Sequence, residues 1–144
     1  MTALIDFKKD LPLFVELGLI AIKQGDEQSA TKLFNAVALI DPQHETVELG
    51  AGLIALHKME LSKAQTHFKK LLGGEKNNWR AQAFLAFTYV LFIMEAGSDE
   101  EKLKYLQEGH KLAQEVLERS DEPSTRQLAQ SVLDWEIELQ QKGK

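Results

Sequence analysis

The chain has 144 residues, of which 44% are hydrophobic and 27% are charged, so it carries enough apolar material for one compact core. It contains no cysteine, which excludes disulfides, thiolate zinc sites and cysteine nucleophiles. The formal net charge of -5, without a cluster of Lys and Arg, argues against a surface that binds nucleic acid. We expect a single domain, residues 1–144, that needs no metal or cofactor.

The sequence has no candidate membrane span or export signal. Its longest run rich in apolar residues, Ala81 to Met94, is 14 residues long, whereas a spanning helix needs about 20. The first residues carry Asp6 and Asp10 inside what would have to be the apolar part of a signal peptide. A cytoplasmic location is therefore expected.

Helices are predicted along the whole chain, with glycine, proline and aspartate at the breaks between them. A short helix near residues 2–9 precedes Pro12, which suits the first turn of the next helix. Ser98 and Glu101 have the spacing of a capping box at the start of a later helix. The predicted helices after the first cover residues 13–24, 27–39, 43–58, 61–72, 78–94, 99–119 and 124–142.

Two stretches of the sequence, residues 11–44 and 45–78, superpose at a spacing of 34 residues. The matching positions are Gly18 and Gly52, Ala30 and Ala64, and Phe34 and Phe68. Small residues at such positions let two helices approach closely, and the phenylalanines fill the space between neighbouring helix pairs. The period and the residue types together predict a helical repeat protein.

These stretches resemble the tetratricopeptide repeat. The resemblance implies an all-α fold, a right-handed α-α superhelix of about three helix pairs with an N-terminal helix and a C-terminal capping helix. A degenerate third repeat is expected over residues 79–120, where Leu85 and Ala86 match the offsets of the first repeat but the inter-helix turn is displaced by several residues. Residues 124–142, with Trp135 on an apolar stripe, resemble the polar cap that solenoids need.

In this repeat fold the first helix of each pair lines the concave face, and here each first helix carries more apolar residues than one packing face needs. In the first repeat, Phe14, Leu17 and Ala21 are expected to pack inward, which leaves a second apolar stripe. Exposed apolar surface of this kind usually marks an interaction site and suits an amphipathic helix or an extended segment. The predicted binding groove consists of Val15, Leu19, Ile22, Lys23, Leu49, Leu53, Leu56, His57, Ala83, Phe87, Val90 and Leu91.

Two alternatives stand beside an open groove. The N-terminal helix, or the C-terminal helix through Trp135, would make the same surface part of the core by folding onto it. A homodimer would bury the surface between two copies. In either case the groove is too apolar for the carboxylate clamp with which related repeats hold the acidic tails of heat-shock chaperones, because Lys23, His57 and Arg80 supply too few polar groups.

The sequence contains no pattern typical of an active site. The four histidines, His44, His57, His67 and His110, have no i, i+4 pair and no HExxH motif. Three successive carboxylates, residues 99–101, suit the positive end of a helix dipole. We therefore expect a binding protein rather than an enzyme.

The small size, acidic charge and repeats resemble the tetratricopeptide-type chaperones of bacterial type III secretion systems. The resemblance lies in GDEQSATKLFNAVALIDP and in VELGAGLIALHKMELSKAQTHFKKLL. It implies that the partner is another polypeptide, a needle or translocator subunit whose apolar helix or extended segment lies in the groove. The alternative is a structural adaptor or assembly subunit that joins two folded partners, since such repeats also serve as scaffolds.

Overall fold

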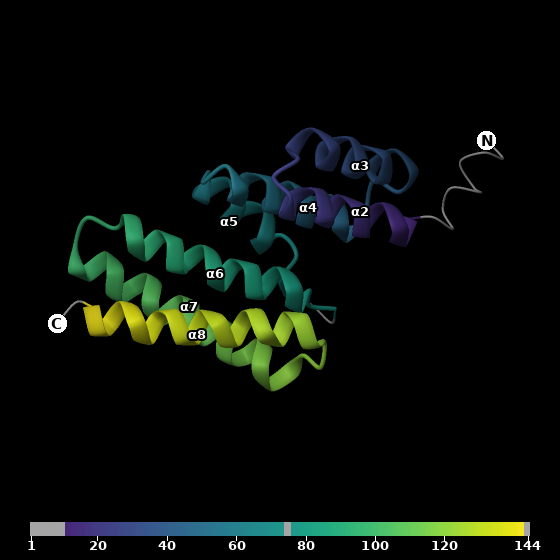
Figure 1. Cartoon of the computed structure of the whole chain (residues 1–144). Helices are drawn as coiled ribbons and strands as arrows, with labels where there is room; N and C mark the ends of the chain where they lie inside the picture. Colours follow the sequence, from purple (N-terminus) through teal and green to yellow (C-terminus); the bar gives the residue numbers. More distant parts are fainter. Residues whose placement is uncertain (1–10, 74–75, 143–144) are drawn as a thin grey trace. The chain divides into compact units, whose positions relative to one another are not determined.

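The structure is a computed structural model that describes residues 11–73 and 76–142. These residues form seven helices and no strand, so the prediction of an all-α chain is confirmed (Figure 1). The expected helix near residues 2–9 lies outside the described residues. The superhelical arrangement of the repeats stays a prediction. The helices are α2 (Leu11–Lys23), α3 (Glu27–Ile40), α4 (Glu45–His57), α5 (Leu61–Lys69), α6 (Trp79–Glu95), α7 (Asp99–Arg119) and α8 (Pro123–Lys142).

The helices begin and end close to the predicted residues, because local side chains satisfy their terminal backbone groups. Asp26 accepts a hydrogen bond from the Ser29 amide at 3.1 Å and so caps α3. Ser98 accepts from the Glu101 amide at 3.2 Å and caps α7. The returning bond of the expected capping box goes instead from the Gly97 amide to Glu101 Oε2, one residue before the predicted donor.

The largest error in the predicted helix limits is at the end of α5, which stops at Lys69 rather than near residue 72. The amides of Leu71 and Leu72 bond to the carbonyls of Phe68 and Lys69, three residues back. This tighter turn leads to Gly73, whose φ of +93° lies in the left-handed region that favours glycine. The helix therefore ends in a turn of 3₁₀ type before the break.

The chain forms two compact units, and the boundary between them falls within α5, between His67 and Phe68. We call them the N-terminal unit and the C-terminal unit and describe each by itself. The single domain expected from the sequence stays a prediction.

The N-terminal unit is built around the ring of Phe34, a residue that is only 5% exposed. A Cβ atom added at Gly18 on α2 would lie 2.8 Å from Phe34 Cζ, and one at Gly50 on α4 would lie 2.6 Å from Phe34 Cγ. The ring therefore fills a space that two glycines leave open. The glycine of α4 whose added Cβ atom would meet the ring is Gly50.

In the C-terminal unit α6, α7 and α8 each pack against the other two (Figure 1). The buried centre consists of small residues, which allow the three helices to approach closely. Larger side chains such as Trp79, Leu112 and Leu133 surround this centre and are partly buried. The central residues are Ala83, Ala86, Val90, Ala113, Val116, Ala129 and Val132.

Candidate functional site

The predicted groove residues of the N-terminal unit are mostly covered. Leu49, Leu53 and Leu56 of α4 are buried, with exposed fractions of 4%, 5% and 8%. Leu19 and Ile22 of α2 are half-buried and pack against the cluster that contains Phe34. In this unit the apolar stripe of α4 is therefore buried rather than exposed.

The assignment of faces on α2 was partly wrong. Leu17 was expected to pack inward, yet it is 42% exposed, whereas Ala21 is buried as predicted. Val15 is half-buried, and the two polar members of the predicted groove, Lys23 and His57, are exposed. Leu19 and Ile22 are half-buried because α2 packs on both α3 and α4, so the buried arc of this helix is wider than one stripe.

The C-terminal unit brings three of the predicted groove residues, Phe87, Val90 and Leu91, to one pocket of about 250 Å³. The fourth, Ala83, is fully buried in the core. We call this cavity the α6–α8 pocket because α8 supplies its other wall. The residues that line it are Phe87, Val90, Leu91 and Met94 of α6 and Trp135, Glu138 and Leu139 of α8.

Two aromatic rings join the walls of the α6–α8 pocket. The ring centroids of Phe87 and Trp135 lie 5.3 Å apart with an angle of 52° between the ring planes, a favourable tilted geometry. The C-terminal helix thus packs on the predicted binding face of α6, as the second alternative expected for Trp135. The cover is incomplete, because Trp135 is 37% exposed and Met94 is 67% exposed.

The chemistry of the α6–α8 pocket is that of an apolar anchor site. Six of its seven lining residues are apolar, and Glu138 is the single charged member. Its volume is below the roughly 300–1,000 Å³ of typical small-molecule sites, so it suits one apolar side chain of a partner. Met94 adds a flexible and polarisable wall that adapts to different side chains.

Sequence reasoning found the α6 wall of this pocket but not all of its members. Met94 was missed although it follows Val90 by four residues and Leu91 by three, the spacing of one helix face. Glu138 and Leu139 were also missed as site residues. No local signal marks them, because their place in the wall depends on how α8 packs against α6.

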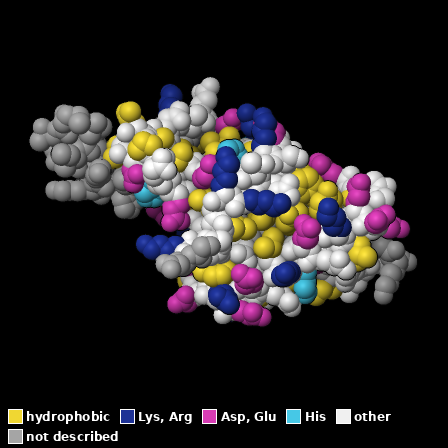
Figure 2. All heavy atoms as spheres, turned by 180° about the vertical axis from the view of Figure 1, so that it is seen from behind, with side chains coloured by type: hydrophobic (Ala, Val, Ile, Leu, Met, Phe, Trp, Pro, Cys, Tyr) yellow, Lys and Arg dark blue, Asp and Glu magenta, His cyan; other side chains and the backbone are white. Residues whose placement is uncertain are grey.

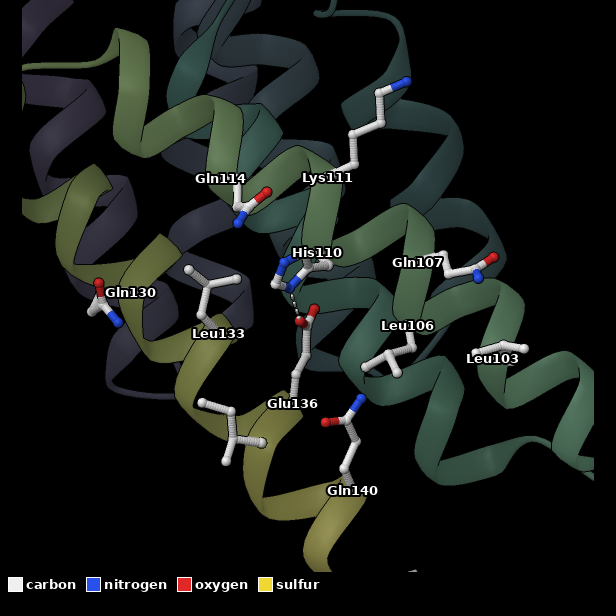
Figure 3. A pocket seen from close by; sticks show the side chains of 11 residues that line it. Leu103, Leu106, Gln107, His110, Lys111, Gln114, Gln130, Leu133, Glu136 and Gln140 are labelled. Carbon is white, nitrogen blue, oxygen red and sulfur yellow. Dashed lines mark hydrogen bonds and ion pairs between the residues drawn. The ribbon is translucent and has the colours of Figure 1, made fainter.

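A second cavity, which we call the α7–α8 pocket, has a volume of about 610 Å³ (Figure 3). Its floor holds Glu136 of α8, which is 3% exposed and whose Oε2 lies 3.0 Å from His110 Nδ1 of α7. Burial raises the pKa of the Glu136 carboxyl, and the hydrogen bond and charge of His110 oppose that rise. The lining residues are Leu103, Leu106, Gln107, His110, Lys111, Gln114, Gln130, Leu133, Glu136, Ile137 and Gln140.

The histidines have separate local roles. His44 accepts a hydrogen bond from the Thr46 amide and caps α4. His67 pairs with Glu48, and His110 pairs with Glu136, in each case between neighbouring helices. Within the described ranges, no three His, Asp or Glu side chains are grouped as metal ligands would be.

The surface and the helices add two observations. Figure 2 shows one face of the chain, on which basic and acidic side chains are interspersed among hydrophobic ones. No helix in the described part of the chain is both long enough and apolar enough to cross a membrane.

Comparison of the chain with family models, curated proteins and solved structures finds no match.

Proposed function

We propose that this chain binds another polypeptide by holding one of its apolar side chains in the α6–α8 pocket. The observation that carries the proposal is the exposure of Met94 and Trp135 at the mouth of an apolar cavity. Burial of an apolar side chain lowers the free energy of the complex, by roughly 25 cal/mol per Å² of apolar surface removed from water. An aromatic anchor beside a pocket is also the usual form of an energetic hot spot in protein interfaces.

The resemblance of the repeats to tetratricopeptide-type secretion chaperones supports a more specific proposal. The partner would then be an export substrate, and its apolar helix would be kept from aggregating by contact with the pocket. Of the predicted groove residues in the first two repeats, only those whose side chains reach the surface are proposed to contact the partner. A structural adaptor remains the competing function from the sequence.

The test compares two substitutions of exposed apolar residues. Met94→Asp places a charge at the mouth of the pocket, and Leu39→Asp, the matched control, changes a residue of α3 that is 74% exposed. Both variants should keep the helical circular dichroism of the wild type, because neither position is buried. Each protein is then used to capture partners from the native cell, followed by mass spectrometry.

The proposal expects one partner to be retained by the wild type and by Leu39→Asp and to be lost with Met94→Asp. A synthetic peptide covering the partner's apolar segment should then change the fluorescence of Trp135 on binding. Equal retention by both variants would refute the pocket as the binding site. If the partner bound only as a folded protein and none of its apolar segments bound as a peptide, the result would favour the structural adaptor.

A further inference from the structure

Glu136 is a carboxylate enclosed between helices rather than a surface charge. Its side chain is 4% exposed, and one oxygen, Oε2, is paired with His110. Among the described residues no donor reaches the other oxygen, Oε1. A buried charged oxygen that lacks a hydrogen bond costs free energy, because it has lost its water without a full replacement.

The second oxygen, Oε1, lies where α6, α7 and α8 pack together, so its free-energy cost falls on the packing of these three helices. A Cβ atom added at Gly109 of α7 would lie 3.2 Å from Glu136 Oε1 and 3.2 Å from Tyr89 Cβ of α6. The glycine therefore leaves the space that the carboxylate occupies, at the place where α6, α7 and α8 meet. A change in the charge of Glu136 acts on this junction and not on a solvated surface.

Of the titratable groups near Glu136, His110 is the one that is paired with its carboxylate. On α7, His110 and Lys111 line the same pocket, and Figure 3 shows the Lys111 side chain extending away from the Glu136–His110 pair. On α6 the titratable group at this junction is Tyr89, whose Cβ lies beside Gly109. On α8 itself, Asp134 and Glu138 are exposed.

We propose that the Glu136–His110 pair is a pH-dependent contact that holds α8 on α7, tight while Glu136 carries a proton and weakened once that proton is lost. A protonated Glu136 carries no charge to bury. Once the proton is lost, a charged carboxylate is enclosed whose Oε1 has no donor among the described residues. This state is the one that the helix packing tolerates least.

The direction in which stability changes with pH follows from the pKa of the Glu136 carboxyl. Burial raises the pKa of Glu136 above its usual value of 4.5. The stability that the protonated form contributes is fully present below that usual value and is lost as the pH rises through the raised pKa. The C-terminal unit should therefore become less stable toward alkaline pH.

The test follows unfolding of the full chain in urea by tryptophan fluorescence. Both tryptophans of the sequence, Trp79 and Trp135, lie in the C-terminal unit, so the signal reports on that unit. Wild type and Glu136→Gln are compared at several values between roughly pH 4 and pH 8, a range that begins below the usual carboxyl value and extends well above it. The matched control is Glu48→Gln, which alters the half-exposed Glu48–His67 pair of the N-terminal unit.

The proposal expects the unfolding constant of the wild type to rise with pH relative to that of Glu136→Gln. The rise amounts to about ten-fold for each pH unit between the folded and unfolded pKa values of the carboxyl. Glu48→Gln should follow the wild-type curve. Parallel curves for wild type and Glu136→Gln would overturn the proposal. No partner is present, so the outcome is independent of peptide binding.

A second measurement covers the case in which Glu136→Gln does not fold. The side-chain carboxyl carbons of the wild type are titrated by nuclear magnetic resonance, with His110→Gln used to assign the coupled signal. A Glu136 signal that titrates above the other glutamates supports the proposal. A signal that titrates together with exposed glutamates such as Glu138 contradicts it.

Discussion

The two units bring their helices close together in different ways. The N-terminal unit places one large ring, Phe34, against two glycines, Gly18 and Gly50. The C-terminal unit instead has a centre of alanine and valine, with larger side chains around it. The comparison teaches that close packing rests on a single residue in the first unit and is spread over many in the second, so the first should be more sensitive to one substitution.

The units also contain two Glu–His pairs in contrasting settings. Glu48 and His67 are each 30% exposed, whereas the Glu136 side chain is 4% exposed beside a His110 that is 51% exposed. Surface pairs contribute little to stability because water and salt screen them. An enclosed carboxylate is costly whenever its partner cannot neutralise it. The same two residue types thus have different consequences in the two units.

The largest effect is expected for Phe34→Ala, which would empty the centre of the N-terminal unit. Loss of a buried phenylalanine ring typically destabilises a protein by about 3–5 kcal/mol. Val116→Ala in the C-terminal unit removes fewer carbon atoms from a fully buried site and should cost less. Amide hydrogen exchange should show lost protection over α2 to α4 for Phe34→Ala. Equal loss over α6 to α8 would show that the two units unfold together.

A smaller effect is expected for Gly50→Ala, whose Cβ would meet the inner atoms of the Phe34 ring at 2.6–2.8 Å. Overpacking of this kind destabilises a protein by about 1–3 kcal/mol. The higher helix propensity of alanine offsets roughly 1 kcal/mol of this loss. Gly18→Ala would bring its Cβ to 2.8 Å from Phe34 Cζ, at the far end of the ring, and should cost less than Gly50→Ala. Urea denaturation followed by circular dichroism measures both. Equal midpoints for the two variants would show that the ring moves freely.

The smallest effect is expected at Glu122, which caps α8. Hydrogen bonds from Thr125 and then Ser124 lower the pKa of its carboxyl to about 2. Glu122→Ala should cost about 1 kcal/mol near neutral pH, as the loss of a helix cap does. Because the pKa is lowered, this contribution is present above the usual value of 4.5 and is lost as the pH falls toward about 2.

The Glu122 prediction is checked by tryptophan fluorescence during urea unfolding at pH 7 and at about pH 3. The difference between wild type and variant should shrink at the acidic value. Asp26→Ala removes the corresponding cap of α3 and should leave this signal unchanged, because both tryptophans lie in the C-terminal unit. A shift with Asp26→Ala would mean that the units unfold together.

Much of the helical structure could be predicted because its signals are local. Gly25 and Gly73 have positive φ angles at predicted breaks, and Asp26 and Ser98 cap the helices that follow them. The errors concern the end of α5, which stops at Lys69 rather than near residue 72, and the faces of α2. Leu17 of α2 is exposed although it was expected to pack inward, since the way α2 packs on α3 and α4 decides which of its faces are buried.

The candidate site was predictable on α6 and hidden on α8. An excess of apolar residues on α6 pointed to Phe87, Val90 and Leu91, which line the α6–α8 pocket. Glu136 gave no signal, because one glutamate in a largely polar helix is typical of an exposed position. Its enclosure depends on Gly109, a residue 27 positions earlier in the chain.

The sequence by itself determined where the described helices lie and, apart from the end of α5, where each of them stops. These properties depend on residues within a turn or two of each other, where capping and periodicity act. Only the tertiary structure decided that the leucines of α4 are buried, that α8 forms a wall of the α6–α8 pocket and that Glu136 is enclosed. Burial depends on which helices meet, and residues far apart in the sequence settle that together.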